Sequence, residues 1–366
     1  MTQTNNAARR ELIVLGVAAA ASAAAIWKII RSNKHFLNGP CSNDPTVIDN
    51  FYLERAHELR LSLKPPLQSN FRVVALFLLE DGKVVFGTND EPSPNISLAM
   101  CAERCALLEY RVMKHTESVK SIYIVTDASS PVSPGTACRE YMNGHPAIQR
   151  DTRIVMQSKD KSSHPLVMTL AKLHPFPSIY NKLDPEEQSN LGASIQQCVQ
   201  MELEHLDVPE LSRQQVLQLV KVAHQACGMD DQDSLHVIRY GAAMAIQTDS
   251  SNGTIEIIQA SQIKALEFSS TLDAVCQLAS RVLSLTSNEP GKKDAPRVLA
   301  LIQVDQFGIP HGPFAQARAF LVEHGLGDCR VILTSIEGDL TTGKSKTPLV
   351  RCVVARQLAP FLPEFR

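Results

Sequence analysis

The sequence lacks a strong excess of charge of either sign, and it lacks a dense set of cysteines. It has 36 Lys and Arg against 38 Asp and Glu, a net charge of -2, and no long basic run. Such a chain has no general attraction for nucleic acid or anionic lipid, so no nucleic-acid partner is expected. The nine cysteines are odd in number and widely scattered. This excludes a dense disulfide framework and favours a reducing compartment.

What is present is sufficient for a globular protein of more than one domain. The chain has 366 residues, of which 44% are hydrophobic and 20% charged. This length and composition predict more than one folded domain, and the order of elements along the chain places two domains at residues 36–180 and 213–366. Residues 181–212 are richer in acids and Gln, and the run Asp-Pro-Glu-Glu at 184–187 is a typical helix start. We therefore expect a helical linker between the two domains.

Residues 1–35 form a separate N-terminal segment. From Leu12 to Ile30 nearly every residue is apolar, with basic residues on both flanks and Trp27 near the end. As a helix rising about 1.5 Å per residue, this run spans about 28 Å, close to the roughly 30 Å of a bilayer core. We expect a single-pass membrane anchor, with the globular part in a reducing compartment. The alternative is a cleaved, mitochondrial targeting segment, since residues 1–10 contain arginine but no acid.

The first half alternates helical and strand patterns, and the second half repeats the plan. The expected elements of the first half are a helix over 45–63, strands over 71–79 and 83–87 around an Asp81-Gly82 turn, a helix over 97–114, a strand over 121–126, and a helix after the Pro-Gly loop at 134–135. Those of the second half are a helix over 214–227, strands over 240–247 and 254–259 around a turn at 251–253, a helix over 271–283, a strand over 298–304, and a helix after 309–313.

The two halves also end alike. Residues 170–176 read Leu-Ala-Lys-Leu-His-Pro-Phe, and residues 357–361 read Gln-Leu-Ala-Pro-Phe. An internal duplication explains the repeated order and the matched ends. The predicted fold class is α/β, with two duplicated three-layer α/β/α domains, each around a mixed central sheet, plus an N-terminal hydrophobic helix.

Two segments of the first half have a pattern typical of metal chemistry. Residues 100–107 read Met-Cys-Ala-Glu-Arg-Cys-Ala-Leu, and residues 133–140 read Ser-Pro-Gly-Thr-Ala-Cys-Arg-Glu. A Cys-Ala-Glu at one helix start, with a second Cys at another, is the layout of a zinc-activated hydrolytic deaminase. In that layout Cys101 and Cys138 bind the metal, which lowers the pKa of a bound water, and Glu103 carries its proton to the leaving nitrogen. Gly135 stands where a third ligand is expected.

These segments resemble those of the cytidine deaminases, in the larger form that has a catalytic domain followed by a degenerate copy. The run Ser-Asn-Phe-Arg-Val at 69–73 resembles that family's strand entry, which implies that Phe71 packs on the pyrimidine. Gly-Thr-Asn-Asp-Glu at 87–91 resembles its Gly-x-Asn-x-Glu segment, which implies that Asn89 and Glu91 hold the ribose hydroxyls. The likeness covers roughly residues 45–366.

The resemblance implies a function as well as a fold. The reaction would be zinc-dependent hydrolytic deamination of cytidine or deoxycytidine to uridine or deoxyuridine in pyrimidine salvage, with one zinc site in the first domain. We also expect a homodimer. The second half departs from the family: residues 272–275 read Leu-Asp-Ala-Val where Cys-Ala-Glu would fall. Residues 310–314 read Pro-His-Gly-Pro-Phe where the Cys pair would fall, so that half is expected to be a structural copy.

Gly135 leaves two interpretations of the first half open. In one, zinc is held by Cys101, Cys138 and a substitute such as Cys105, which shares the helix face at i+4, or by two cysteines and extra water. Cys105 as an ordinary core residue is the alternative for that side chain. In the other interpretation the chain is an inactive, membrane-tethered pseudoenzyme that binds a nucleoside or serves as an assembly subunit. His311 is expected to pack in a loop or interface, since no acid or thiol is near it in sequence.

Overall fold

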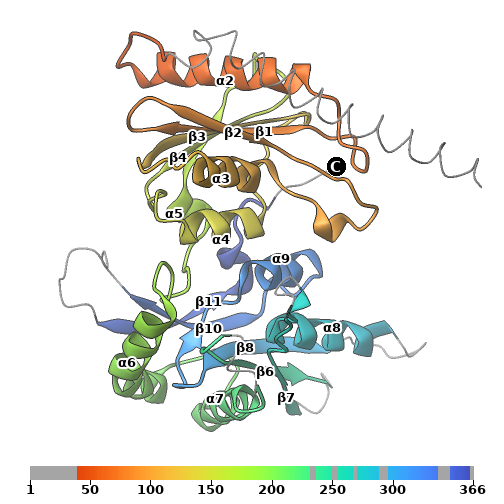
Figure 1. Cartoon of the computed structure of the whole chain (residues 1–366). Coiled ribbons are helices and arrows are strands. Elements are labelled where there is room, and N and C mark those ends of the chain that lie inside the picture. The colour runs from red at the N-terminus through yellow and green to blue at the C-terminus, as the bar shows by residue number, and fades with distance from the viewer. Residues whose placement is uncertain are drawn as a thin grey trace, which may run out of the picture. The chain divides into compact units, whose positions relative to one another are not determined.

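The structure is a computed structural model that describes residues 39–230, 236–248, 254–266, 270–287, 296–336 and 347–362. It contains a five-stranded and a six-stranded β-sheet, each with helices beside it (Figure 1). By internal contacts the chain divides into two compact units, Met1–Ser130 with Gln157–Pro165, and Pro131–Met156 with Leu166–Arg366. The predicted α/β class is confirmed. The domain boundaries expected from the sequence stay a prediction.

The first sheet has the strand order β2-β1-β3-β4-β5. Its strands are β1 (Val73–Leu79), β2 (Val84–Thr88), β3 (Val119–Thr126), β4 (Arg153–Gln157) and β5 (Leu166–Thr169). The hairpin predicted at Asp81-Gly82 is confirmed: β1 and β2 pair antiparallel, and Gly82 has a φ of 81°, which glycine adopts without strain. Strand β1 is buried along almost its whole length because it also pairs with β3 on its other side.

Helix α2 (Pro45–Ser62) covers one face of strands β1 and β3, and helix α3 (Ala102–Val112) packs against β1 and β2 from the other face (Figure 1). Helix α2 begins where the sequence predicts, because the Asp44 carboxylate accepts a bond of 2.8 Å from the Thr46 amide and Pro45 suits the first turn. The shorter helical elements are η1 (Ile96–Leu98), α4 (Thr136–Gly144) and α5 (Leu170–Leu173).

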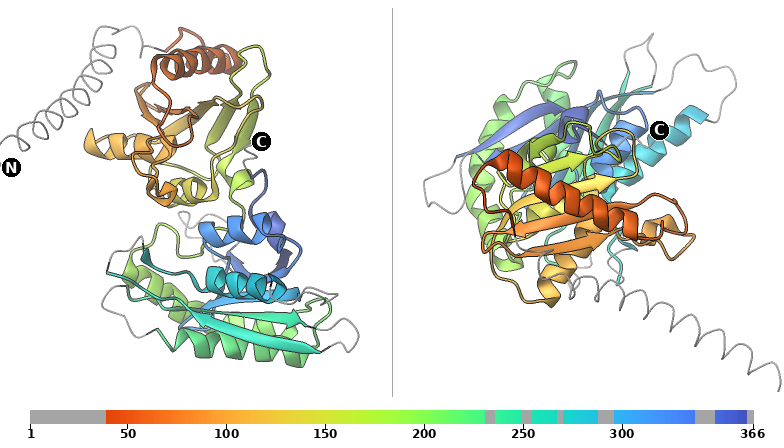
Figure 2. Two further views of the ribbon diagram at one scale, coloured as in Figure 1. Left: turned by 90° about the vertical axis from the view of Figure 1, so that its right-hand side faces the viewer. Right: turned by 90° about the horizontal axis from the view of Figure 1, so that it is seen from above.

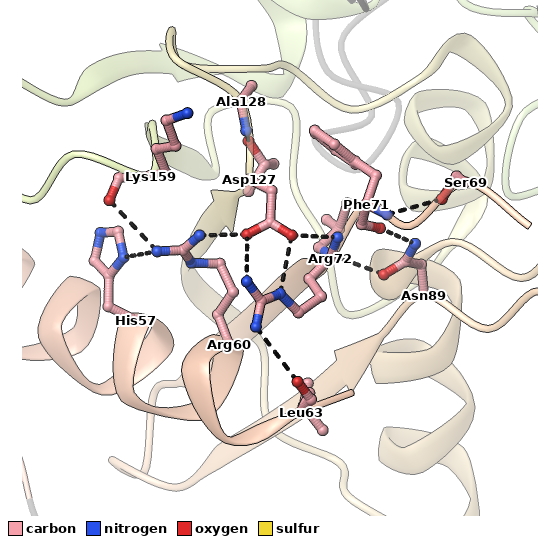
Figure 3. A network of polar contacts seen from close by, with 12 residues as sticks. His57, Arg60, Leu63, Ser69, Phe71, Arg72, Asn89, Asp127, Ala128 and Lys159 are labelled. Atoms are coloured by element: carbon pink, nitrogen blue, oxygen red, sulfur yellow. Dashed lines mark hydrogen bonds and ion pairs between the residues drawn. The ribbon is translucent and has the colours of Figure 1, made fainter. Parts of the chain in front are cut away.

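The C-terminal end of α2 is fastened to the ends of β1 and β3 by one shared carboxylate (Figure 3). Asp127 binds the Arg60 guanidinium at 2.5 Å, and the Arg72 Nε and the Arg72 amide at 2.9 and 2.8 Å. Burial alone would raise the pKa of Asp127, but the bonds from Arg72 and Arg60 more than offset it and hold the pKa below its ordinary value. This network fixes the backbone at Arg72, immediately before the buried part of β1.

The second sheet has the order β11-β10-β8-β6-β7. Read from β7 to β11, this order matches the first sheet read from β2 to β5, with the hairpin β7-β6 in place of β2-β1. Its strands are β6 (Tyr240–Gln247), β7 (Ile255–Ser261), β8 (Arg297–Asp305), β10 (Arg330–Ile336) and β11 (Pro348–Val354), with the short β9 (Pro310–His311) beside β8. Strands β8 and β10 run parallel and the other described pairs antiparallel, so the sheet is mixed.

This sheet lies between two pairs of helices (Figure 2). Helices α6 (Pro185–His205) and α7 (Arg213–Cys227) cover one face, and α8 (Ala274–Ser287) and α9 (Ala315–Glu323) cover the other. Successive residues of β6 alternate between the two cores: Ala243 and Ala245 pack with α6 and α7, while Ala242, Met244 and Ile246 pack with α8 and α9. The chain near its C-terminal end forms η4 (Ala355–Leu358).

Helix α6 lies within residues 181–212, where the sequence predicts a helical linker, and it has a capping box formed by Asp184 and Glu187. Its buried side chains join the core of the second sheet, so the helix packs against that sheet as well as connecting the halves. Strands β4, β5, β10 and β11 were missed. Strands β4 and β10 are short and mostly buried, and such runs have no decisive period.

The N-terminal prediction concerns residues that the structure does not describe. The apolar run from Leu12 to Ile30, with its mitochondrial alternative, lies outside the described residues, as does the turn predicted at 251–253. Among the helices that are described, none is both long and apolar enough to cross a bilayer. The longest described helix, α6, has 21 residues but includes four glutamates. The prediction of a single-pass membrane protein is therefore corrected, since this finding does not support it.

Candidate metal centre

Helix α3 lies very close to strand β2, and this closeness sets where its first turn is. A Cβ built on Gly87 would come within 2.2 Å of the Ala102 carbonyl oxygen and 2.3 Å of the Ala106 amide nitrogen. Ala102 and Ala106 are themselves fully buried, so small residues on both elements permit the contact. The Gly-x-Asn-x-Glu segment therefore requires its glycine for packing.

The α3 helix starts later than the sequence predicts, and the reason bears on the site. Asp90 and Met100 form an isolated antiparallel bridge, with both backbone N–H···O bonds at 2.9 Å. Met100 is thus extended, Cys101 becomes the N-cap, and the helix begins at Ala102 rather than at residue 97. No signal in the sequence identifies such a bridge. It fastens the segment containing Asn89 and Glu91 directly beside Cys101.

Two predicted site residues occupy the start of α3. Cys101 is half-buried, and Glu103, in the first turn, is 4% exposed. The Arg104 guanidinium donates to the Ala99 carbonyl at 3.0 Å and to the Cys101 sulfur at 3.5 Å. A cation and a helix N-terminus beside a sulfur both favour its thiolate, which is the form that binds metal. Sequence reasoning did not assign a role to Arg104.

Helix α4 with its N-cap contains the other two positions of the predicted metal site, Gly135 and Cys138. Gly135 is its N-cap, with φ -61° and ψ 158°, and Cys138 is the third helical residue, 1% exposed. No heavy atom lies within 4 Å of a Cβ built on Gly135. Neither the backbone conformation nor the surroundings therefore require glycine at this position. The third thiolate is missing although there is space for its Cβ.

The structure brings the three principal residues of the predicted site together. The metal-ligating atoms of Cys101, Glu103 and Cys138 lie within 4.8 Å of one another. Among the described residues this is the one group of three or more such side chains. Two sulfurs that share a tetrahedral zinc at about 2.3 Å each lie about 3.8 Å apart, so the donor set and its spacing fit a zinc ion. Two cysteines and the carboxylate expected to move the proton are present, and the position expected to supply a third ligand is Gly135.

Cys105 does not complete this group. It is half-buried one turn further along α3 and is not among the clustered metal-ligating atoms. Burial raises the pKa of its thiol, and the charge of Asp90 raises it further. Because Cys105 is partly buried and lies outside the clustered group, the structure favours its interpretation as a packing residue.

The residues expected to bind the substrate lie side by side at the start of β1. The Asn89 amide donates to the Phe71 carbonyl at 2.8 Å and to the Glu91 carboxylate at 3.0 Å, and its oxygen accepts from the Val73 amide at 2.8 Å (Figure 3). Glu91 also accepts from the Ser69 amide and hydroxyl at 2.8 and 2.9 Å. These bonds fix both side chains before any ligand binds. Their role toward a ribose stays a prediction.

The matching positions of the second half carry no such group. Ile263 and Leu272 form the bridge that corresponds to Asp90 and Met100, and the next residue, Asp273, caps α8 through its bond of 2.8 Å from the Cys276 amide. At the third position of α9, where α4 has Cys138, stands Ala317. Val275 takes the place of Glu103 and cannot carry a proton.

The surroundings of His311 differ from the sequence prediction in one respect. It is 1% exposed and packs in the interior, but an acid does lie beside it: its Nε2 is 3.0 Å from the Asp305 carboxylate. The phenol of Tyr180 donates to the same carboxylate. Asp305 is six residues earlier and on the neighbouring strand, which a search of the flanking sequence did not consider.

Comparison with known proteins finds cytidine deaminases that are similar to part of the chain. No family model matches the chain. A cytidine deaminase of Sporosarcina psychrophila is 41% identical over 80 residues, which is 21% of this chain and 57% of that protein. One of Halalkalibacterium halodurans is 39% identical over 74 residues, 20% of this chain and 54% of that protein. Over this partial region the chain is homologous to cytidine deaminases. It spans little more than half the length of these curated relatives.

Solved cytidine deaminase structures are similar to about a third of the chain. The enzyme of Burkholderia pseudomallei is 26% identical with a TM-score of 0.30, over 34% of this chain and 94% of that one. The enzyme of Mycobacterium leprae is 23% identical with a TM-score of 0.28, over 34% and 93%. None of these findings supports the expected homodimer or the membrane association, so the homodimer stays a prediction and the membrane is not proposed.

Proposed function

We propose that this chain is a zinc-dependent hydrolase that deaminates cytidine or deoxycytidine to uridine or deoxyuridine, with ammonia as the second product. The observation that carries the proposal is the meeting of Cys101, Glu103 and Cys138 within 4.8 Å at two helix starts. The sequence homology to cytidine deaminases over a partial region supports the same reaction. A role in pyrimidine salvage is part of this proposal.

Each residue of the group has a part in the chemistry. Cys101 and Cys138 would hold the metal, which when bound acts as a Lewis acid that activates water. The Glu103 carboxylate takes a proton from that water and delivers it to the amino nitrogen that leaves as ammonia. The buried position of Glu103 excludes bulk water from this transfer. Phe71 would pack on the pyrimidine, and the Asn89 oxygen and the Glu91 carboxylate would accept hydrogen bonds from the ribose hydroxyls.

A second candidate function is favoured by one observation, the open space at Gly135. A missing thiolate weakens metal binding, since the loss even of an outer-shell partner typically costs about 10–100-fold in affinity. The alternative is then a catalytically inactive deaminase-like protein that binds a nucleoside or serves as a subunit of an assembly. The duplicated, degenerate second half fits this alternative equally well.

The test measures bound metal and turnover in the full chain. The purified protein is loaded with zinc, its metal content is determined by mass spectrometry, and uridine formation from cytidine and from deoxycytidine is followed. Glu103→Gln is expected to keep its metal and to lose turnover by about 10²–10⁴-fold, the usual contribution of a positioned proton carrier. Glu109→Gln, on the same helix, is the matched control and is expected to keep both.

The possible outcomes separate the candidates. Loss of the metal in Glu103→Gln would mean that Glu103 is a ligand and not the proton carrier. Metal binding without turnover of either nucleoside in the native chain would overturn the deaminase proposal. Calorimetric binding of cytidine in that case would establish the inactive, nucleoside-binding alternative.

A further inference from the structure

Arg139, the residue after Cys138, is a fully buried cation held by backbone carbonyls. Its Nε donates to the Pro134 carbonyl at 2.7 Å, and its Nη1 to the Leu173 and Pro360 carbonyls at 2.7 and 2.6 Å. Its Nη2 donates to the Phe361 carbonyl at 2.6 Å. Pro134 and Leu173 belong to the first half of the chain (residues 36–180), whereas Pro360 and Phe361 come from the second (residues 213–366).

Arg318 occupies the corresponding position of helix α9 and makes the same set of bonds with the halves exchanged. Its Nε donates to the Pro313 carbonyl at 2.7 Å, and its Nη1 to the Leu358 and Pro175 carbonyls at 3.3 and 2.7 Å. Its Nη2 donates to the Phe176 carbonyl at 2.6 Å. Each arginine therefore binds the loop before its own helix, the closing segment of its own half, and the Pro-Phe pair of the other half.

The two Pro-Phe pairs also share a backbone conformation. Phe176 has a φ of 46° and Phe361 a φ of 53°, a left-handed conformation that non-glycine residues rarely adopt. This turn aims the carbonyls of Pro and Phe at one guanidinium. The same rare conformation at both matched positions shows that both segments are bound in one way.

The loops before the two helices differ at one position that contacts the arginines. At Arg139 the Ser133 hydroxyl accepts from Nη2 at 2.9 Å and donates to the Phe361 carbonyl. At Arg318 the matching residue is Gly312, where an added Cβ would come within 3.0 Å of the guanidinium and 3.1 Å of the Phe176 carbonyl. The site on α4 thus has an additional bridge and the one on α9 has a closer backbone.

We propose that the two halves hold each other's closing segments through Arg139 and Arg318, so that the second half fixes the loop and first turn of α4, which carry Gly135 and Cys138. A buried guanidinium is stable only when its donors are bound, and here most of its acceptors are carbonyls from two segments. Release of Pro360 and Phe361 would leave Arg139 short of acceptors and free the loop at Ser133 and Pro134. The degenerate half then acts as a built-in subunit, independent of whether the first half is an active enzyme.

The test is hydrogen–deuterium exchange on the full chain, with two matched variants. Arg139→Gln is expected to raise exchange in the peptide that contains Phe361 about tenfold more than in the peptide that contains Phe176. Arg318→Gln is expected to give the reverse pattern. Charge-assisted hydrogen bonds of this kind contribute enough to local stability to produce such a change. If either Gln variant fails to fold, Arg139→Lys and Arg318→Lys, which keep the charge without the fork, are expected to show the same crossed pattern more weakly.

A second readout follows the metal-site helix itself. Alkylation of the buried Cys138 is expected to accelerate in Arg139→Gln but not in Arg318→Gln, with the buried Cys227 of the second half as the internal reference. Equal effects of both variants on both peptides, or parallel acceleration at Cys138 and Cys227, would show general destabilisation and overturn the proposal. Unchanged hydrogen–deuterium exchange in both peptides would overturn the proposal as well.

Discussion

The backbone at Gly135 lies in the extended region and accepts any L-residue, and the space beside it is open. Gly135→Cys therefore adds a thiol without a steric cost. We expect the variant to bind zinc at least about 100-fold more tightly than the native chain, because a first-shell thiolate contributes more than the outer-shell groups whose loss costs about 10–100-fold. Competition with a chromophoric chelator measures the affinity, and deamination of cytidine is expected to rise with it.

The control variant adds a side chain of similar size that binds zinc far more weakly than a thiol. Gly135→Ser adds a hydroxyl, a far weaker zinc ligand, and is expected to leave the affinity unchanged. Adding Glu103→Ala to Gly135→Cys is expected to abolish turnover while the metal stays. Equal zinc affinity and activity in the native chain and in Gly135→Cys would show that another residue already completes the site.

At the scale of elements, the contact between α3 and β2 is the most sensitive point of the site. In Gly87→Ala the new methyl would overlap the backbone of α3, and overpacking of this kind typically costs about 1–3 kcal/mol. We expect the free energy of unfolding to fall by at least this amount, measured from the urea midpoint at constant slope. Gly135→Ala, which meets no atom within 4 Å, is the control and should be neutral. An unshifted midpoint in Gly87→Ala would contradict the contact.

The elements themselves were largely predictable, and the failures have physical causes. Strand β6 begins and ends where expected, and α2 ends within one residue of its predicted bound, because capping residues and apolar periods are local properties. Helix α3 and the corresponding helix α8 of the second half both start later than predicted. The reason is that Met100 pairs with Asp90, and Leu272 pairs with Ile263, immediately before these helices. Pairing of that kind depends on tertiary contacts that no local pattern encodes.

In the candidate site, too, local patterns were predictable and tertiary contacts were not. The pattern predicted that Cys101, Glu103 and Cys138 would meet, since each lies at a helix start in a matched motif. It did not predict the Arg104 contact with the Cys101 sulfur or the Asp305 partner of His311, because both depend on how side chains turn in the folded chain. The substitute role offered to Cys105 followed helix spacing alone, and the structure leaves Cys105 outside the clustered group.

At the scale of the whole molecule, we expect at most one zinc ion per chain. The positions of the second half that match Cys101, Glu103 and Cys138 hold Asp273, Val275 and Ala317, in which two of the three side chains have no ligating atom. The double variant Cys101→Ser, Cys138→Ser is therefore expected to lose all tightly bound zinc, measured after exhaustive dialysis. A full equivalent remaining in that variant would reveal a second site, and Cys276→Ser, away from the group, serves as the control.

The bonds from Arg139 to Pro360 and Phe361 join residues that are 221 and 222 positions apart in the chain. A ribosome that adds roughly 5–20 residues per second needs roughly 10–40 s to pass from one to the other. During that interval α4 can form its own turns, but the Arg139 guanidinium lacks two of its carbonyl partners. The first half therefore emerges from synthesis with one buried cation incompletely bound, and the order of translation makes the metal-site helix one of the last parts of the protein to become fully native.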